Sequence, residues 1–365
     1  MTLSTTGSLQ QIREKVERGE RISAADGEHL FDPGVDLHAV GHLADSARRR
    51  RHGPRTYYNL NAHINPTNIC IYRCALCAYS RDADDPTAYV LSEEEILARA
   101  AEAHAAGCTE LHVVGGVHPE KPYSWYRGLL AAIHAAYPRL HLKAFTAVEI
   151  AWFAQLTGRS FEAILDDLRE AGLGSLPGGG AEVFDPQVRN QISPRKANAE
   201  TWLAVHRAAH GLGIRSNASM LFGHLESIDH RIEHLVALRR LQDETGGFMA
   251  FIPLVFHPEN TRLSYLEKPS SLDALRTLAV SRLMLDNFDH VKAYWVTLGV
   301  GVAQTALGYG ADDLDGTVSR EAIHHEAGAE SPQLLSLTRI RALIREAGLE
   351  PIERDSLYRP LPPAG

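Results

Sequence analysis

Short apolar segments alternate with helical patterns over residues 60–300, and this alternation limits the fold more than any other feature of the sequence. Strands separated by helices pair in parallel through crossover connections, which gives either a (β/α) barrel or a doubly wound sheet. The pattern therefore predicts an α/β protein, and periodicity alone does not choose between the two arrangements. The expected strands are 60–69, 110–114, 142–148, 174–176, 214–222, 249–256 and 292–298.

The segments on either side of this alternation differ from it. Residues 1–58 carry amphipathic helical patterns and predict an N-terminal helical segment. No low-complexity linker interrupts 59–300, so one barrel-sized domain is expected there. Residues 301–365 contain a further helical pattern and are expected to form a C-terminal extension that closes the barrel.

The composition of the chain limits the kinds of molecule that it is expected to bind. Hydrophobic residues make up 44% and charged residues 22%, which suits a globular core. A net charge of -8 argues against sequence-independent binding to nucleic acid, and the run Arg48 to Arg51 is read as the solvated end of a helix. No apolar run approaches the roughly 20 residues of a membrane span, so we expect a cytoplasmic protein without nucleic-acid or membrane partners.

Three of the four cysteines, Cys70, Cys74 and Cys77, lie on one loop after the first expected strand. A cubane iron–sulfur cluster normally takes four thiolates, so three on one loop leave one iron open for chemistry. Zinc is the main alternative, but structural zinc takes four ligands and no second cysteine pair is present. Cys108 stands alone and is read as a small buried residue.

Two glycine-containing loops also follow expected strands. Gly115-Gly116 follows the second strand, and Gly178-Gly179-Gly180-Ala181-Glu182 follows the fourth. Glycines let a backbone approach a ligand closely and adopt positive φ. The alternatives are an ordinary turn at Gly115-Gly116 and a salt bridge between Glu182 and Arg189.

The spacing C-x3-C-x2-C, directly after the first strand of a β/α series, resembles the radical S-adenosylmethionine (SAM) superfamily. The resemblance implies a TIM-like barrel, expected as the six-stranded partial barrel of that superfamily. It also implies a [4Fe–4S] cluster whose open iron is chelated by the amino and carboxylate groups of SAM. An electron, expected from a flavodoxin or ferredoxin, then cleaves SAM and releases a 5′-deoxyadenosyl radical.

The same resemblance implies cofactor-binding residues. The backbone of Gly115 and Gly116 is expected to receive the methionyl amino group, although Val117 stands where many members have glutamate. Glu182 is the candidate for the ribose hydroxyls. The further cofactor-binding candidates are Gly179, Gly180 and Arg189.

Longer segments resemble one group in the superfamily. Asn61 to Cys70, Gly115 to Pro119 and Pro177 to Glu182 are similar to the group of two menaquinone enzymes of the futalosine pathway and the deazaflavin synthase subunits. Asp243 to Phe248 and Phe251 to Thr261 look most like the aminofutalosine synthase family. Lys292-Ala293-Tyr294-Trp295 and Gly310 to Thr317 support that choice.

This resemblance implies a specific reaction. The adenosyl radical would add to 3-[(1-carboxyvinyl)oxy]benzoate, with rearrangement and decarboxylation, to give 6-amino-6-deoxyfutalosine for menaquinone synthesis. The alternatives are a cyclic dehypoxanthinylfutalosine synthase and a deazaflavin synthase-like enzyme. A non-catalytic iron–sulfur carrier or scaffold is a different class, but it would need neither a barrel nor an open iron.

Such a substrate carries two carboxylates and needs cationic or hydrogen-bonding partners at the strand ends. Each candidate by itself is equally a satisfied structural residue, and their common location is what supports them. The expected catalytic residues are His118, Glu182 and His324. The expected substrate-binding residues are Asn65, Thr146, Glu149, Asn217, Ser219, His257 and Asn260.

Overall fold

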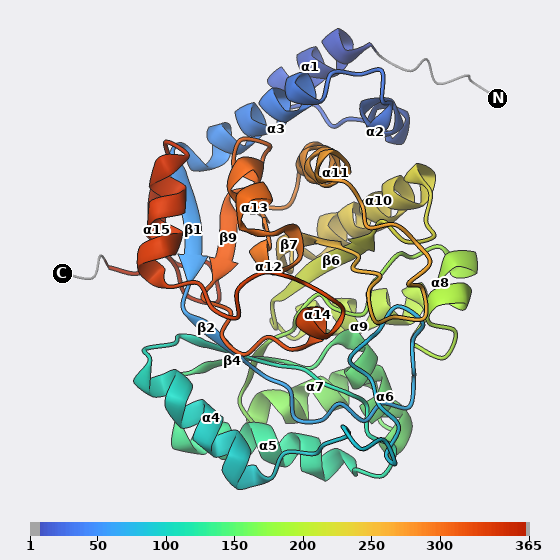
Figure 1. Cartoon of the computed structure of the whole chain (residues 1–365), viewed down its shortest axis with the longest axis vertical. Helices are drawn as coiled ribbons and strands as arrows, with labels where there is room; N and C mark the ends of the chain where they lie inside the picture. The colour runs from blue at the N-terminus through green and yellow to red at the C-terminus, as the bar shows by residue number, and fades with distance from the viewer. Residues whose placement is uncertain (1–7, 363–365) are drawn as a thin grey trace.

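Parallel strands form the centre of the molecule and helices surround them (Figure 1). The computed structural model describes residues 8–362. The strands pair in the orders β2-β3-β4-β5, β6-β7-β8 and β10-β1-β9, and every pairing is parallel. Their bounds are β1 Arg55–Asn59, β2 Asn61–Ile64, β3 Glu110–Val113, β4 His141–Ala144, β5 Leu173–Ser175, β6 Ser216–Phe222, β7 Phe248–Val255, β8 His290–Val291, β9 Asp313–Gly316 and β10 Glu350–Glu353.

Isolated bridges join the three sheets into a ring. Leu176 pairs with Ser216 next to β5 and β6, and Lys292 pairs with Asp313 next to β8 and β9. Because β1 leads into β2 almost without a break, β9 fills the position between β8 and the β1–β2 strand. The predicted TIM-like α/β barrel is confirmed. Strands β2 to β7 supply the six strands that were expected, and β8 and β9 extend the ring.

Helices between successive strands cover the outside of the ring. Their starts are fixed locally: the S-x-x-E pattern from Ser92 to Glu95 predicts a capping box, and in the structure each of these side chains accepts a hydrogen bond from the other residue's backbone N–H. The helices are α4 Glu93–Ala105, α5 Tyr123–Ala136, α6 Ala147–Thr157, α7 Phe161–Glu170, α8 Pro186–Ile192, α9 Ala199–Gly211, α10 Ile228–Thr245 and α11 Ser271–Met284. Among the described residues, no helix combines the length and apolarity needed to cross a bilayer.

The expected N-terminal helices are present as α1 (Leu9–Glu17), α2 (Ala24–Phe31) and α3 (Leu37–His52). They pack on the outer helices α10 and α11, at one end of the molecule in Figure 1. The prediction of a solvated basic run was wrong for Arg48, which is fully buried and pairs with Asp45 at 2.8 Å. It lies on the helix face that packs toward the barrel.

The C-terminal part supplies β9 and β10 together with short helices. The expected strand at 292–298 was wrong, because strand β8 ends at Val291, Lys292 forms an isolated bridge and Trp295–Leu298 forms helix α12. A short apolar run is compatible with either a buried strand or a buried helix, so the pattern could not decide. The remaining elements are α13 Val300–Ala306, α14 Ile323–Glu326 and α15 Leu337–Glu346.

Candidate active site

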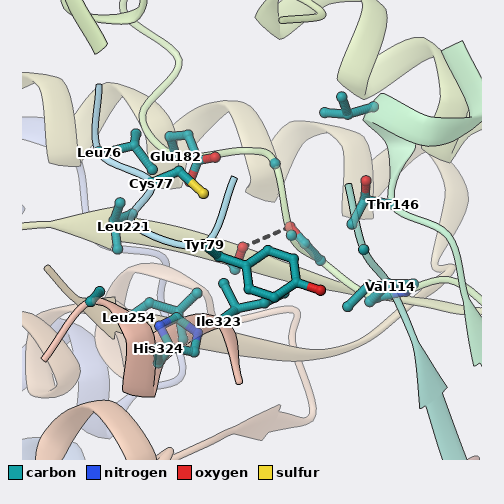
Figure 2. A pocket seen from close by; sticks show the side chains of 18 of the residues that line it. Leu76, Cys77, Tyr79, Val114, Thr146, Glu182, Leu221, Leu254, Ile323 and His324 are labelled. Carbon is teal, nitrogen blue, oxygen red and sulfur yellow. Dashed lines mark hydrogen bonds between the residues drawn. The ribbon is translucent and has the colours of Figure 1, made fainter. Parts of the chain in front are cut away.

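A cavity of about 280 Å³ lies at the carboxyl ends of the strands, where barrel enzymes carry their active sites. The loops after β2, β3, β4 and β5 form its wall, and residues of α14 cover it. Figure 2 shows Cys77, Glu182 and His324 around one space, although they are far apart in the sequence. The fold therefore collects most of the expected site residues in one place.

The cysteine loop contributes all three of its thiols to this cavity. Cys70, Cys74 and Cys77 line it, and burial raises the pKa of Cys74 to about 11. The loop is held from outside, since the backbone N–H of Ala75 donates to the carbonyl oxygen of Ile192 at 2.7 Å. This hydrogen bond helps to fix the backbone that carries the three thiols.

The arrangement of the thiols fits a cluster better than a single ion. Among the described residues, the one group of three ligating atoms within 4.8 Å of one another is His52, His290 and Asp312, and the cysteines are more widely spread. Zinc, with Zn–S bonds of about 2.3 Å, would hold tetrahedral thiolates roughly 4 Å apart. A cubane distributes its thiolates over several irons and spreads them further. Three cysteines on one cavity wall therefore suit a [4Fe–4S] cluster with one open iron.

Gly116 is required by the close approach of two loops. Its N–H donates to the carbonyl oxygen of Thr67 at 2.7 Å, and a Cβ atom there would overlap the carbonyl oxygen of Ile69. At Gly115, a Cβ atom would lie 2.9 Å from the Thr67 oxygen. The glycine pair therefore lets the loop after β3 lie directly against the cysteine loop. Its expected contact with SAM stays a prediction.

The second glycine loop lies directly on β6. A Cβ atom at Gly178 would lie 2.6 Å from the carbonyl carbon of Ala218, so only glycine fits this contact. The hydroxyl of Ser219 donates to the carbonyl oxygen of Gly178 at 2.6 Å. Gly180 has a φ of +84°, which a glycine adopts without strain. Gly179 and Gly180 both line the cavity.

Glu182 pairs with Lys196 and not with Arg189. The Lys196 ammonium lies 2.5 Å from the Glu182 carboxylate, and both line the cavity. Burial opposes ionisation of Glu182, but Lys196 outweighs it and holds the carboxyl pKa below its usual value. Arg189 instead donates to the carbonyl oxygens of Ala181 and Val183 and so braces the loop. Lys196 follows the short helix α8 and belongs to no motif, so no pattern in the sequence pointed to it.

Thr146 and Glu149 were expected at the end of a strand. They form instead the capping box that starts α6, where Glu149 accepts from the Thr146 N–H at 2.6 Å and from its hydroxyl at 2.9 Å. The T-x-x-E pattern in the sequence could have predicted this, as it did at Ser92. Burial raises the pKa of Glu149 to about 7, and both residues still line the cavity.

Two further candidates line the cavity, and each has a buried polar atom without a hydrogen-bond partner. Asn217 Oδ1 and His257 Nδ1 are buried without a hydrogen-bond partner among residues 8–362. His257 Nε2 lies 2.9 Å from the carbonyl oxygen of Thr297, so this nitrogen carries the proton and donates it. Nδ1 is therefore an acceptor in the neutral ring. His324 also lines the cavity, with its ring centroid 5.7 Å from that of Tyr294.

Four expected residues do not line the cavity. His118 Nδ1 accepts from the backbone N–H of Glu120 at 3.1 Å. Asn65 donates to the carbonyl oxygen of Val114, and Asn260 to that of Glu326. Arg189, described above, is the fourth. The structure gives each of them a bond that orders the chain, and their expected catalytic or binding roles stay predictions.

The sequence-based prediction missed the floor of the cavity. Charged and polar side chains from β2, β3, β4 and β9, and from Lys292 directly after β8, meet there, although the strands are almost entirely buried. A charged residue inside a buried apolar strand is the signal that could have found them, since such residues are rarely buried without a partner. The floor residues are His63, Glu110, His112, Lys143, Lys292 and Asp315.

Two protein-family models match the chain from residue 64 almost to its end. The model of the radical SAM superfamily matches residues 64–238. The model of the CofH/MqnC C-terminal region matches residues 245–364. The first range contains the cysteine loop and both glycine loops, and the second contains α12, β9 and α14.

Several curated relatives are similar over almost their full length. The aminodeoxyfutalosine synthase of Thermus thermophilus is 44% identical and covers 96% of this chain and 95% of its own. The aminodeoxyfutalosine synthase of Streptomyces coelicolor is 41% identical, with 96% and 94% covered. The 5-amino-6-(D-ribitylamino)uracil–L-tyrosine 4-hydroxyphenyl transferase of Methanopyrus kandleri is 38% identical, with 95% and 94% covered.

Solved structures share the fold at low sequence identity. Methylornithine synthase superposes with a TM-score of 0.74 at 18% identity, covering 93% of this chain and 97% of its own. The FeFe-hydrogenase maturase HydG from Carboxydothermus hydrogenoformans superposes with a TM-score of 0.75 at 18% identity, covering 96% and 80%.

Proposed function

The chain belongs to the radical SAM superfamily and is an enzyme, and from this premise we propose that it is an aminodeoxyfutalosine synthase. It would join the adenosyl group of SAM to 3-[(1-carboxyvinyl)oxy]benzoate, with rearrangement and decarboxylation, to give 6-amino-6-deoxyfutalosine. The observation that carries the proposal is the 44% and 41% identity to two enzymes of that name over nearly all of the chain. The product would serve menaquinone synthesis.

Cofactor binding is assigned to the carboxyl end of the barrel. Cys70, Cys74 and Cys77 would hold the [4Fe–4S] cluster, and SAM would lie between the glycine loops with Glu182 at its ribose. When bound, the two together supply a carbon-centred adenosyl radical. An acidic electron carrier such as a flavodoxin or ferredoxin would deliver the electron.

The cavity has the lining that such a radical needs. Leu221, Ile252 and Leu254 present apolar side chains to it, and Ile323 of α14 covers them (Figure 2). This cover excludes water, which protects a reactive intermediate from side reactions. The charged groups lie above and below this apolar zone, so the middle of the cavity suits an aromatic ring.

One observation favours a second candidate function. The relatives named 4-hydroxyphenyl transferase are similar at 38% identity, and their substrates carry many hydrogen-bond donors. Asn217 Oδ1 and His257 Nδ1 offer unpaired acceptors that such donors would satisfy. With the enolpyruvyl benzoate, which has no donor when ionised, these acceptors would have to bind the hydroxyl or amino groups of SAM instead.

Product analysis separates these reactions. The anaerobically reconstituted and reduced protein is incubated with SAM and 3-[(1-carboxyvinyl)oxy]benzoate, and the products are identified by mass spectrometry. A product that contains the adenosyl group, with release of methionine, is expected. Free 5′-deoxyadenosine as the main product would indicate hydrogen abstraction and contradict the proposal, as would turnover of tyrosine with the ribitylaminouracil alone.

A further inference from the structure

The floor of the cavity is a row of polar side chains inside the ring. His63, His112 and Lys143 lie opposite one another on β2, β3 and β4, so their side chains stand at one level. The rings of His63 and His112 stack with centroids 4.6 Å apart. Lys292, directly after β8, and Asp315 of β9 complete the floor.

Two ammonium groups in this floor have unused donors. Lys143 Nζ donates to Glu110 Oε2 at 2.6 Å, and Lys292 Nζ donates to Asp315 Oδ2 at 3.2 Å. Each ammonium has three N–H donors, and within residues 8–362 neither Nζ makes a second hydrogen bond. Both side chains are only 2% exposed and both line the cavity. Each Nζ is satisfied by one carboxylate, and its remaining N–H groups are available to a ligand in the cavity that both lysines line.

The chemistry of the donors specifies that ligand. Two ammonium groups that converge on one apolar cavity suit an anion with two acceptor oxygens, which is a carboxylate. Glu110 and Asp315 fix the positions of the two lysines and balance their charge while the cavity holds no ligand. Lys196 is also paired with a carboxylate, Glu182, but it lies beside the cysteine loop and the glycine loop and not in the floor.

We propose that Lys143 and Lys292 bind the ring carboxylate of the aromatic substrate and thereby orient its unsaturated end toward the cysteine loop. The assignment rests on the proposed function, in which the adenosyl carbon adds to the vinyl group. That group must lie near the cofactor, so the ring carboxylate, at the far end of the substrate, points to the floor. Lys143 and Lys292 are positioning residues for the reaction.

The dimensions of the barrel agree with this orientation. Gly115 lies three residues beyond His112 along the chain, which corresponds to about 10 Å at the rise of a strand. Val114, Ile252 and Leu254 line the cavity between the two levels. An aromatic ring with a short acidic side chain spans such a distance, with its faces against aliphatic groups.

Binding of unreactive analogues tests the proposal apart from turnover. The ligand is 3-(1-carboxyethoxy)benzoate, which lacks the vinyl group, and it is compared with the analogue in which the ring acid is a benzamide. Calorimetric titration of the reconstituted protein with SAM bound should give at least a tenfold weaker Kd for the ring amide. Equal affinity for the two ligands in the wild type overturns the proposal.

Variants of the floor residues then show which side chains cause the preference for the ring acid. Lys143→Met combined with Glu110→Gln removes one ion pair without leaving an unpaired charge, and it should abolish most of the tenfold preference. The matched control, Arg354→Met with Asp313→Asn, removes a buried pair that does not line the cavity and should retain the preference. A preference that survives in the first variant overturns the proposal. If that variant does not fold, Lys292→Met with Asp315→Asn takes its place.

A failure of the proposed carboxylate site can be told apart from a failure of the proposed reaction. Preference for the ring acid that depends on Lys143, without formation of an adenosyl-containing product, would retain the carboxylate site and reject the reaction. Formation of the product with no such preference would retain the reaction and reject the site.

Discussion

The two ends of the barrel both bury charged side chains, but these side chains differ in how many of their hydrogen-bonding groups are used. At the amino end, Asp312 Oδ1 accepts from the Val291 N–H at 2.9 Å and from Arg282, and Oδ2 accepts from His290 at 2.5 Å. At the floor of the cavity, Lys143 and Lys292 leave donors unused. Exposure does not separate the two regions, since all of these charged groups are almost fully buried.

The difference shows which buried charges serve stability and which serve a ligand. A buried ion pair is costly to break because the remaining partner is left uncompensated in a medium of low polarity. Where both oxygens of a buried carboxylate are occupied by protein donors, as in Asp312, that carboxylate has nothing left for a ligand. Where donors face a cavity without a partner, ligand binding completes the network. In barrel enzymes the carboxyl end carries the chemistry and the opposite end carries stability.

Proximity of metal-ligating atoms is therefore not sufficient for a metal site. His52, His290 and Asp312 place three such atoms within 4.8 Å of one another. Both oxygens of Asp312 are already used, and the Arg282 guanidinium occupies the position of a cation. His52 Nε2 likewise lies 2.8 Å from the carbonyl oxygen of Asp289. The group is a structural network of ion pairs and hydrogen bonds.

The largest effect, a loss of the cluster and of product formation, is expected from Cys74→Ala at the carboxyl end of the barrel. Two thiolates on the loop cannot hold the cluster, so iron and sulfide content and product formation should fall below detection after reconstitution. Cys108→Ala is the matched control, because Cys108 does not line the cavity and its loss should leave all three unchanged. Unchanged turnover of the Cys74 variant would contradict both the site and the function.

The second-largest effect, a loss of bound iron, is expected from Gly116→Ala. Its Cβ atom would overlap the carbonyl oxygen of Ile69, and the backbone shift that relieves such overlap costs about 1–3 kcal/mol. Because the shift falls on the cysteine loop, most of the bound iron should be lost while the fold persists, as measured by iron analysis and circular dichroism. Gly128→Ala in α5 is the control, since no atom lies within 4 Å of its Cβ position. Equal iron content in the two variants would contradict this prediction, because it would show that the cysteine loop still binds the cluster when the loop after β3 is pushed away from it.

Asp312→Asn tests the opposite end of the barrel. Arg282 and His290 would lose their charged partner, and breaking such a pair costs about 3–5 kcal/mol. The free energy of unfolding in urea should fall by this amount, whereas kcat/KM measured well below the melting temperature should change less than twofold. Glu244→Gln, which removes an exposed pair with Arg207, should leave stability unchanged. A large loss of kcat/KM in the folded Asp312 variant would break the separation between the two ends.

The smallest effect is expected from Glu149→Gln, and it depends on pH. The pKa of Glu149 is raised by burial from 4.5 to about 7 in the folded protein, so the folded state holds a proton that the unfolded state releases. Its contribution to stability is present below pH 4.5 and is lost as the pH rises through about 7. Glutamine does not titrate, so urea unfolding should show the wild type losing about 1–3 kcal/mol relative to the variant between pH 4.5 and 8. A constant difference across this range would contradict the raised pKa.

The sequence determined the fold class and the position of the cluster loop. The alternation of strands and helices predicted a parallel α/β fold, because parallel strands need crossovers, and the resemblance to the radical SAM superfamily selected the barrel. The cysteine spacing and the two glycine loops predicted a cofactor site at the carboxyl ends of the strands, since that is where each loop follows its strand. These features are local, so a single sequence contains them.

Only the tertiary structure decided how the buried charges pair. Lys196, and not Arg189, became the partner of Glu182, and Thr146 became a helix cap. The floor of Lys143 and Lys292 depends on the register of strands more than one hundred residues apart and on the closure of the ring by β9. Spacing along the chain specifies neighbours within an element, whereas contacts across a barrel follow from strand register and packing, which no local pattern encodes.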